Sequence, residues 1–441
     1  MMTEDASMTR RAIMAGAGVA AAATVSNANN AQAQAISVAA QPDTGEHSAA
    51  NFMQGYPPAP NTRVDISNWQ TWPQAKWSVR HMREIFGSRD ATQLQARSLA
   101  LREAPMDMER VRLRTAEGEI SWSQFEANTH TDAIIILVNG RIVHERYLGG
   151  MQPADPHILF SATKSYCGFL AEILAVRGQL DFSRPVESYL PELAATGFAG
   201  ASVRQIADMT DGARFSENYT DPSADVFRYL ADVGLGPRDA RNPPRGTYAA
   251  LQLINAREHP PGHAFAYRSA VTDVLAWVVQ RVANKSLSQL YAEEIHAPIG
   301  AADPAYFTLD AVGQEVAAGG LNISLRDFAR FGEMLRRRGR VGSRQVFPNP
   351  AVDLIFAGGD KDAFARGNQA TRPGWSYKSQ FWCTHDARGS VWLLGVRGQR
   401  LVIVPSLNLV MAKFGSHPVL SNSATDAIHG AALEALEAAL A

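Results

Sequence analysis

The sequence predicts a mixed α/β fold, in the sense of α+β. We expect an antiparallel sheet flanked by N- and C-terminal helices, with a mostly helical lobe inserted. The first observation is Asn139-Gly140 between two strand-like runs, the strongest short signal for a β-hairpin. The second is a group of three short strands joined by tight turns near the C-terminus. The third is that the segments between these two groups of strands have a helical pattern. Both ends of the mature chain therefore contribute to one sheet.

The composition allows a large core and argues against several classes of protein. Of the 441 residues, 46% are hydrophobic and 19% are charged, which argues against intrinsic disorder. The 42 basic residues balance 43 acidic ones, so no overall field attracts nucleic acid, and we expect no nucleic-acid partner. Nearly all the positive charge is arginine, so a lysine within a motif is informative.

Residues 1–35 have the order of an export signal. Arg10-Arg11 precede an apolar run over 12–25, and Ala-x-Ala cleavage sites follow up to residue 35. A membrane anchor is the alternative, but the run of about 14 residues is shorter than the about 20 that span the hydrocarbon core. We therefore expect a cleaved leader of the twin-arginine type, a periplasmic or exported protein, and no stable membrane anchor after cleavage.

The mature chain divides into an arm and a principal domain. Residues 36–125 are rich in Pro, Trp and Arg, with Trp69, Trp72 and Trp77 close together, and they lack a long periodic run. We expect them to form an N-terminal arm that packs on the rest of the molecule. The principal domain is expected over 126–441.

The elements of the principal domain follow one another in a clear order. Strands are expected over 133–138 and 141–147, helices over 161–177, 271–284, 287–295 and 324–338, strands over 390–396, 400–405 and 409–415, and a last helix over 424–440.

The cysteines and histidines do not indicate a metal or disulfide framework. Cys167 and Cys383 each lie in an apolar or aromatic context, so buried free thiols are expected. Neither they nor the 11 histidines have the spacing of a metal site. We expect no metal and no cofactor.

The chemistry is expected where helix 161–177 begins. Ser161-Ala162-Thr163-Lys164 places a hydroxyl at the helix start and an amine one turn later, on the same face. The helix N-terminus favours developing negative charge on Ser161. Burial of Lys164 would favour its neutral amine, which can accept the serine proton. Taken alone, the fragment is equally compatible with an N-capping serine and a surface lysine.

Two more fragments extend this candidate site. Tyr267, within 261–269 and just ahead of an apolar helix, could bridge Lys164 and Ser161 and return a proton to the leaving group. Its alternative is a half-buried core aromatic. Residues 395–399 (Gly-Val-Arg-Gly-Gln) end a strand whose backbone N–H could be an oxyanion donor beside that of Ser161. The alternative there is a simple glycine-flanked hairpin turn.

Ser-x-x-Lys, Pro-Gly-x-x-Phe-x-Tyr-x-Ser and Gly-x-x-Gly in this order resemble the serine β-lactamase and penicillin-binding-protein superfamily. The branch they resemble contains the class C β-lactamases, carboxylesterases and nylon-oligomer (6-aminohexanoate-dimer) hydrolases. The likeness runs from about residue 131 to the end. The most specific segments are 161–168 (SATKSYCG), 217–222 (ENYTDP), 272–277 (TDVLAW), 319–332 (GGLNISLRDFARFG), 381–384 (FWCT) and 395–399 (GVRGQ).

The resemblance implies a β-lactamase-like fold and a role for each matching residue. Ser161 would be the acylated nucleophile, Lys164 its proton acceptor and Tyr267 the general acid and base. The backbone amides of Ser161 and Val396 would form the oxyanion hole.

The resemblance also implies a set of substrate-binding residues. Tyr219 matches a loop tyrosine that closes on the substrate, and Trp382 matches an aromatic residue near the cleft. Ser269 and Arg397 stand at the remaining substrate-binding positions.

Three departures from the family pattern bear on specificity. No lysine is followed by Thr-Gly, so the Lys-Thr-Gly element of many β-lactamases is missing. The Tyr-x-Asn of class C enzymes is replaced by residues 267–269, Tyr-Arg-Ser. Leu230 matches the position of an acidic residue that supports activity on the aminohexanoate dimer. These changes lower the expectation of β-lactam hydrolysis and of recognition of an amino group.

The sequence therefore predicts a serine hydrolase that acts through a Ser161 acyl-enzyme without a cofactor. A small carboxylic ester is the first expected substrate, and a linear amide is the second. A β-lactamase or D-Ala-D-Ala-type peptidase acting on cell-wall peptides is the alternative. A non-catalytic binding protein that kept the fold is the third hypothesis, which the intact Ser, Lys and Tyr set argues against.

Overall fold

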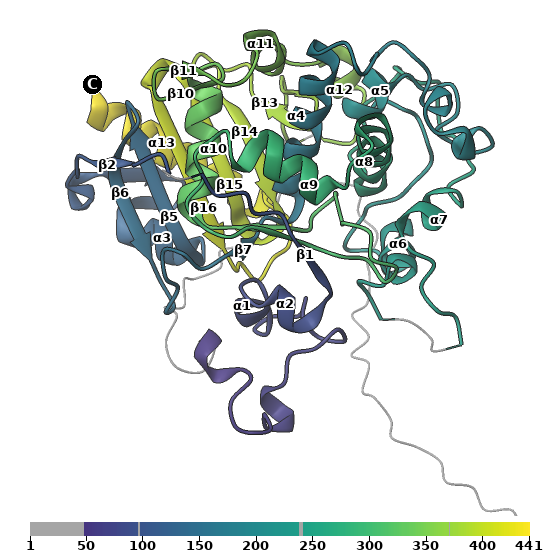
Figure 1. Ribbon diagram of the computed structural model, residues 1–441. Coiled ribbons are helices and arrows are strands. Elements are labelled where there is room, and N and C mark those ends of the chain that lie inside the picture. The colour runs from purple at the N-terminus through teal and green to yellow at the C-terminus, as the bar shows by residue number, and fades with distance from the viewer. Residues whose placement is uncertain (1–47, 96–97, 238–240, 370) are drawn as a thin grey trace, which may run out of the picture. The chain divides into compact units, whose positions relative to one another are not determined.

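The computed structural model describes residues 48–95, 98–237, 241–369 and 371–441 (Figure 1). The expected leader, 1–35, lies outside the described residues, and so do the first positions of the arm. Over the described ranges, no helix has both the length and the apolar content needed to cross a membrane.

The largest sheet has eight strands in the order β12-β13-β14-β15-β16-β5-β6-β2. Their bounds are β2 Arg102–Glu103, β5 Thr131–Val138, β6 Arg141–Tyr147, β12 Ser376–Lys378, β13 Phe381–Cys383, β14 Val391–Gly395, β15 Gln399–Val404 and β16 Leu409–Gly415. Every neighbouring pair is antiparallel except β2 and β6. At the centre β16 pairs with β5, with Ala412 opposite Ile135. The expectation of one antiparallel sheet formed by both ends of the chain is confirmed.

The hairpin between β5 and β6 forms for the reason that its sequence indicates. Asn139 and Gly140 have φ values of 52° and 73°, and a two-residue turn with both values positive matches the twist of the flanking strands. β5 and β16 are almost wholly buried on both faces. Their sequences are therefore mostly apolar throughout and do not alternate between apolar and polar residues.

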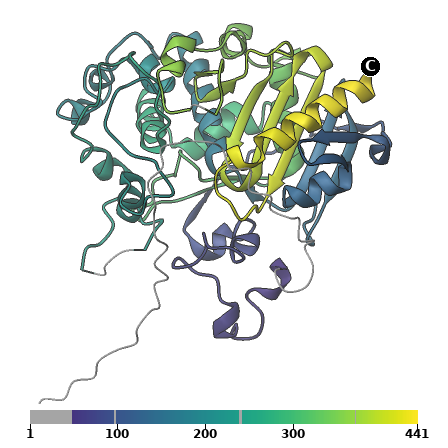
Figure 2. The same cartoon turned by 180° about the vertical axis from the view of Figure 1, so that it is seen from behind.

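Helices cover both faces of this sheet. The C-terminal helix α13, Ser423–Leu440, crosses the face seen in Figure 2 and packs against α3, Trp122–Asn128. The helix α10, Leu325–Arg336, lies on the opposite face against β15, β16 and β5 (Figure 1). Gly332 allows this close approach, because a Cβ there would lie 2.7 Å from Val410 Cγ1. The expectation of a sheet flanked by N- and C-terminal helices is confirmed.

The remaining elements form the helical lobe, a smaller sheet and peripheral hairpins. The lobe contains α4 Thr163–Val176, α5 Val203–Ala207, α6 Asp225–Val233, α7 Thr247–Leu251, α8 Ser269–Ala283 and α9 Leu287–Tyr291, and α11 Asn349–Ala357 and α12 Lys361–Ala365 follow. The smaller sheet has the order β1-β8-β9-β7, with β1 Ser88–Asp90, β7 His157–Ile158, β8 Tyr306–Thr308 and β9 Leu321–Ile323. The hairpins are β3 Arg112–Thr115 with β4 Gly118–Ser121, and β10 Arg340–Val341 with β11 Arg344–Gln345.

Every element expected from the sequence is present, with ends shifted by at most a few residues. The helix expected over 287–295 is α9 followed by a π-helical turn, Ala292–His296. The elements α5, α6, α7, α11, α12, β12 and β13 were not expected from the sequence; each is short, at most nine residues long.

The arm packs through a small apolar cluster of its own. Among its described residues, α1 spans Ala75–Ser78 and α2 spans Met82–Ile85. Trp69, Trp77 and Met82 are buried together with Ile158 and Tyr306 from the smaller sheet. The expected boundary between residues 125 and 126 falls inside α3, and β2 is already a strand of the main sheet.

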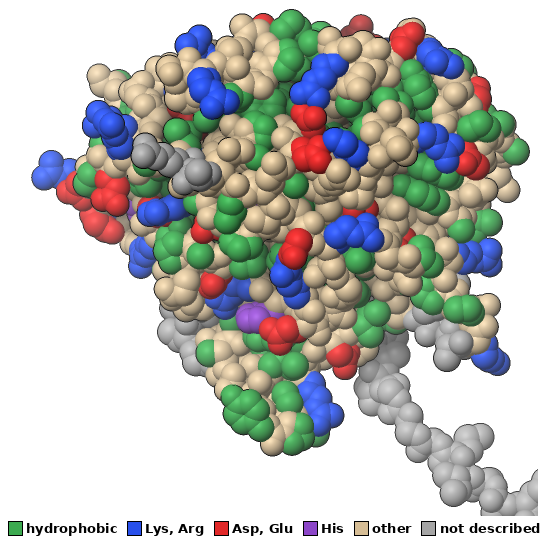
Figure 3. Space-filling view, viewed as in Figure 1, with side chains coloured by type: hydrophobic (Ala, Val, Ile, Leu, Met, Phe, Trp, Pro, Cys, Tyr) green, Lys and Arg blue, Asp and Glu red, His purple; other side chains and the backbone are tan. Residues whose placement is uncertain are grey.

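The surface carries charges of both signs. In the face shown in Figure 3, Lys and Arg side chains alternate with Asp and Glu, and no large single-sign patch is visible among the described residues.

Candidate active site

Ser161 lies in a tight turn that leads into α4. The turn is the 3₁₀ segment Phe160–Ala162, and Phe160 has a φ of 45°, a region that bulky residues avoid. Neighbouring glycines let the backbone close around this turn. A Cβ at Gly395 would lie 2.1 Å from the carbonyl oxygen of Leu159, so the end of β14 can touch the nucleophile turn only because glycine stands there.

Lys164 points back from the first turn of α4 toward Ser161. Its Nζ donates to Ser161 Oγ at 3.0 Å and to the carbonyl oxygen of Ala318 at 2.6 Å. The side chain is only 1% exposed. The alternative of an N-capping serine with a surface lysine is therefore wrong, since Ala162 is the cap of α4 and the lysine is buried. An amine held on the nucleophile in this way can accept its proton.

Tyr267 completes the group, on the loop just before α8. Its hydroxyl lies near enough to Ser161 and Lys164 for both to influence its pKa, and the lysine Nζ lies 5.2 Å from the ring centroid. The ring stacks on Trp382 at 5.4 Å and meets Tyr377 edge-on. Burial raises the pKa of Tyr267, while the charge of Lys164 and the hydrogen bonds to Ser161 and Lys164 oppose that rise. The structure therefore brings together all three residues expected to be catalytic.

The two residues whose backbone N–H groups are the expected oxyanion donors belong to the lining of one cleft. Ser161 and Val396 both line it, with Val396 at the point where β14 ends. Asn422 holds this turn from two sides, because its side-chain amide donates to the carbonyl of Gly395 at 2.8 Å and its oxygen accepts from the N–H of Gly398 at 3.2 Å.

Arg397 lines the cleft but its guanidinium is bound to backbone carbonyls. It donates to His417 at 2.9 Å and to Gln70 of the arm, and its side chain is 3% exposed. Burial lowers its pKa to about 10. These contacts tie the end of β14 to the arm, a role that the sequence did not indicate. Its expected part in substrate binding stays a prediction.

Glu217 organises the expected substrate-binding residues Tyr219 and Ser269. One carboxylate oxygen accepts from Tyr219 Oη at 2.8 Å and from Ser269 Oγ at 2.7 Å, and the other accepts from the backbone N–H of Ser269. The sequence reasoning did not single out this glutamate. Its signals in the sequence were its place two residues before Tyr219 and at the start of the matching segment 217–222.

Asp273 is a second residue that the sequence reasoning missed. This carboxyl on α8 is 3% exposed, accepts from Tyr229 Oη at 2.8 Å and from the N–H of Ala318 at 3.1 Å, and lines the cleft. The carbonyl of Ala318 accepts from Lys164 Nζ, so the Asp273 carboxyl and the Lys164 amine are both hydrogen-bonded to this one residue. Burial raises the pKa of Asp273 to about 7, against the lowering effect of Tyr229 and Lys164.

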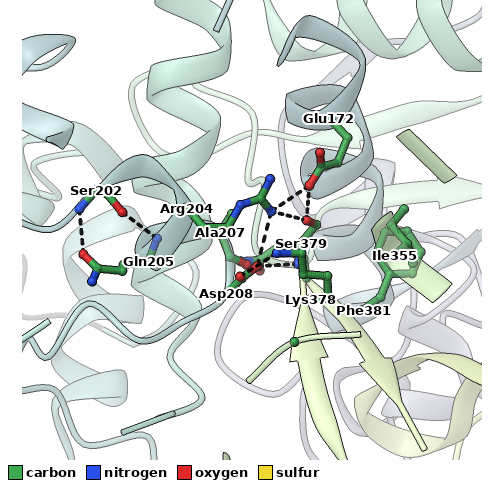
Figure 4. A network of polar contacts seen from close by, with 12 residues as sticks. Glu172, Ser202, Arg204, Gln205, Ala207, Asp208, Ile355, Lys378, Ser379 and Phe381 are labelled. Carbon is green, nitrogen blue, oxygen red and sulfur yellow. Dashed lines mark hydrogen bonds and ion pairs between the residues drawn. The ribbon is translucent and has the colours of Figure 1, made fainter. Parts of the chain in front are cut away.

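Trp382 belongs to a hairpin that is anchored beneath the site. The turn between β12 and β13 contains Ser379, whose carbonyl oxygen would lie 1.9 Å from a Cβ placed at Gly168 of α4. Figure 4 shows the polar network that holds this turn, formed by Glu172, Arg204, Asp208, Lys378 and Ser379. The network fixes the hairpin from which Tyr377 and Trp382 reach Tyr267.

The cleft encloses about 930 Å³, including the part open to solvent. Its lining residues are Trp69, Gln70, Met82, Ile158, Phe160, Ser161, Tyr219, Val226, Tyr229, Leu230, Val233, Leu235, Thr247, Ser269, Asp273, Thr308, Val316, Ala318, Gly319, Gly320, Val396, Arg397 and Leu420. Three of these come from the arm, so the arm contributes directly to the candidate site.

Two features of the described chain bear on metals and redox chemistry. Cys167 and Cys383 are free and buried, as expected from their apolar contexts. No group of three or more His, Cys, Asp or Glu side chains in the described ranges is placed to hold a metal ion.

A serine hydroxyl that accepts from a buried lysine, with a tyrosine next to it and an antiparallel sheet beside it, is the arrangement expected of one class of hydrolases. A family model described as Beta-lactamase matches residues 113–435. The chain belongs to this family.

Within the family, the chain is similar to the 6-aminohexanoate-dimer hydrolase of Paenarthrobacter ureafaciens. The two are 32% identical over 377 residues, which is 85% of this chain and 92% of that protein. A solved structure from Bacillus anthracis, provisionally assigned as a 6-aminohexanoate-dimer hydrolase, is 27% identical with a TM-score of 0.77, covering 87% of this chain and 97% of its own. The hydrolase EstCE1 shares the fold, at 16% identity and a TM-score of 0.56, over 71% of this chain and 96% of its own.

These relatives, together with the family match, identify a serine hydrolase that acts on amide or ester bonds.

Proposed function

We propose that the protein hydrolyses small carboxylic esters through an acyl-enzyme on Ser161. Linear amides are the second substrate class that we propose. The observation that carries this proposal is the contact of the buried Lys164 amine with the Ser161 hydroxyl, next to Tyr267. The substrate is a small molecule, and the chain's own residues supply the chemistry.

The first half of the reaction acylates the serine. Ser161 Oγ attacks the substrate carbonyl while Lys164 and Tyr267 take its proton. The oxyanion is bound by the backbone N–H groups of Ser161 and Val396, in a setting where buried donors stabilise developing charge better than water does. Tyr267 then protonates the leaving alkoxide or amine, and the bond to it breaks.

The second half repeats these roles with water. A water molecule gives a proton to the Tyr267 and Lys164 pair and attacks the acyl carbonyl, and Ser161 leaves with that proton. Esters are favoured over amides because an alkoxide leaves with less help than an amine does. The missing Lys-Thr-Gly element is the reason for ranking esters and linear amides ahead of β-lactams.

Active-site labelling tests this proposal. We expect a fluorophosphonate to label the protein on Ser161, and Ser161→Ala to lose labelling and to lose p-nitrophenyl acetate hydrolysis by at least about 10³-fold. Ser343→Ala, at an exposed serine, is the matched control and should keep both. Labelling that persists in Ser161→Ala would reject the proposal. Turnover of a chromogenic cephalosporin comparable with that of the ester would favour the β-lactamase alternative.

We also propose that the protein is exported to the periplasm through the leader at 1–35. The support is the order of Arg10-Arg11, apolar run and Ala-x-Ala sites in the sequence. Fractionation of cells that express the full chain tests it. Replacing both arginines by lysine should shift the protein to the cytoplasmic fraction, and an unchanged distribution would contradict the proposal.

A further inference from the structure

Arg268 stands directly after Tyr267 in the chain, and its charged side chain is buried. It is 1% exposed, although arginine is almost never buried without a partner. Its Nη2 lies 3.7 Å from Oδ2 of Asp211, whose side chain is 0% exposed. The proposed mechanism uses neither of these two side chains, so the buried ion pair must serve another purpose.

The side chain of Arg268 reaches back past Tyr267. Its Nε donates to the carbonyl oxygen of Ala266 at 3.2 Å, so one side chain joins the residues on either side of the tyrosine. The backbone of Arg268 is extended, with φ −149° and ψ 118°, and α8 begins at the next residue. The guanidinium therefore restricts rotation of the backbone at Tyr267, and with it the direction in which the phenol points.

The carboxylate of Asp211 is itself held in place. Its Oδ1 accepts from the N–H of Ala213 at 2.9 Å. Two residues earlier, the carbonyl oxygen of Met209 accepts from the N–H of Ala266 at 3.0 Å, so the segment that ends at Asp211 is attached to the loop of the tyrosine through its backbone as well. The carboxylate can therefore act as a fixed anchor for the guanidinium.

We propose that Arg268, anchored by Asp211, is a positioning residue for Tyr267. The inference rests on the proposed function, in which Tyr267 is the general acid and base. Proton transfer requires that the phenol stay within hydrogen-bond reach of its partners, and a displacement of about 1 Å can cost about 10²-fold in rate. The arginine acts through the tyrosine and not on the substrate.

The orphaned atoms of the pair allow stability and positioning to be separated. Arg268 Nη1 and Nη2 and Asp211 Oδ2 have no hydrogen-bond partner within the described residues. Each charge therefore depends on the other for compensation, and removal of one partner leaves a buried charge that is unpaired. Replacing both partners by apolar side chains removes that penalty but does not restore the link to Ala266.

The experiment compares p-nitrophenyl acetate with ethyl acetate in Arg268→Met. A p-nitrophenolate leaves without being protonated, whereas an ethoxide needs the proton of Tyr267. We expect kcat/KM for ethyl acetate to fall by about 10²-fold, at least about tenfold more than kcat/KM for p-nitrophenyl acetate. A smaller population of folded molecules would instead lower both values equally.

Three further variants separate this loss from a loss of stability. Arg268→Met/Asp211→Leu should regain the unfolding temperature of the unaltered protein but keep the lowered ratio of ethyl to p-nitrophenyl acetate. Arg268→Lys keeps the charge without the guanidinium fork, so its ratio should be intermediate. Arg330→Met is the matched control, because it breaks the buried ion pair with Asp327 on α10, at 2.6 Å; it should lower stability and leave the ratio unchanged.

The outcomes distinguish this inference from the proposed function. An unchanged ratio in Arg268→Met overturns the positioning role, and so does an unchanged ratio in the double variant and Arg268→Lys if the single variant does not fold. An equal fall of the ratio in Arg330→Met would also overturn it. In each of these cases Ser161-dependent hydrolysis of p-nitrophenyl acetate still stands. Absence of that hydrolysis in the unaltered protein overturns the proposed function and this inference with it.

Discussion

Lys164, Ala318 and Asp273 form one connected unit behind the nucleophile. The amine donates to the carbonyl of Ala318, and the N–H of the same residue donates to Asp273. Movement of Ala318 would therefore disturb the Lys164 amine, which we propose to be catalytic. The carboxyl also faces charged and titratable groups on other elements, namely Asp310 after β8 and Tyr229 on α6. This arrangement makes Asp273 a positioning residue whose protonation affects the folded state.

The sign of that effect follows from the pKa of Asp273. Burial raises it to about 7, above the about 3.9 of an unfolded aspartate. The folded state therefore binds more protons than the unfolded state between these values, so this group's contribution to stability is full below about pH 4 and is lost as the pH rises through about 7. The rise of this pKa from about 3.9 to about 7 corresponds to a loss of about 4 kcal/mol.

We expect Asp273→Asn to remove this pH dependence. Urea unfolding of both proteins from about pH 5 to about pH 8 measures it, through the difference in unfolding free energy between the variant and the unaltered protein. That difference should shift in favour of the variant as the pH rises. A difference that is constant over the range would contradict the assignment of the raised pKa to this carboxyl.

At the scale of elements, α4 and the hairpin of β12 and β13 are fitted together without space for a methyl group. Gly168→Ala would place a Cβ 1.9 Å from the Ser379 carbonyl oxygen, which is backbone and cannot move aside alone. We expect a loss of about 2–3 kcal/mol in unfolding free energy and a fall in kcat, because the hairpin carries the aromatic residues that hold Tyr267.

Gly430→Ala in α13 is the matched control for this change. No atom lies within 4 Å of a Cβ there, so the substitution should be neutral or should stabilise the helix by up to about 1 kcal/mol. Equal stability of the Gly168 and Gly430 variants would show that the hairpin is not held by this contact.

The sequence predicts elements and catalytic residues whose signals are local. The β5–β6 hairpin is indicated by Asn139-Gly140, and the pair of Ser161 and Lys164 by their spacing of three along a helix. The structure has both.

What the sequence did not predict depends on contacts between distant segments. Glu217 and Asp273 become site residues only because their partners Ser269 and Ala318 fold against them. Arg397 matched a substrate-binding position, yet its guanidinium meets carbonyls of the arm and of residue 417, which no local pattern encodes. A hydrogen bond between two side chains that lie far apart in the sequence leaves no periodic pattern in it from which the contact could be predicted.

At the scale of the whole molecule, the arm is part of the binding cleft. Trp69 stacks on Phe160 beside the nucleophile, with ring centroids 6.3 Å apart, and its Nε1 donates to the carbonyl of Leu235 at 3.2 Å. One buried side chain of the arm therefore joins the catalytic turn to the segment that follows α6.

We expect Trp69→Ala to open this wall of the cleft. The loss of a buried tryptophan should cost about 3–5 kcal/mol of unfolding free energy, and kcat/KM should fall more for p-nitrophenyl hexanoate than for the acetate. Trp69→Phe keeps a ring but loses the Nε1 donor. Its thermal unfolding temperature and its ratio of kcat/KM for hexanoate over acetate should therefore lie between those of Trp69→Ala and those of the unaltered protein. Equal losses on both esters would indicate that the arm acts only through stability.

The position of β16 between β15 and β5 also determines when the enzyme can become active during its synthesis. The β5–β6 hairpin and α4 leave the ribosome before Ala412, the partner of Ile135, has been translated. Until then one edge of the hairpin has unpaired N–H and C=O groups and invites wrong association. Pairing over such a sequence separation is slow. We therefore expect the main sheet to close only after β16 has been translated, with the apolar hairpin edge as the surface that a chaperone would shield until then.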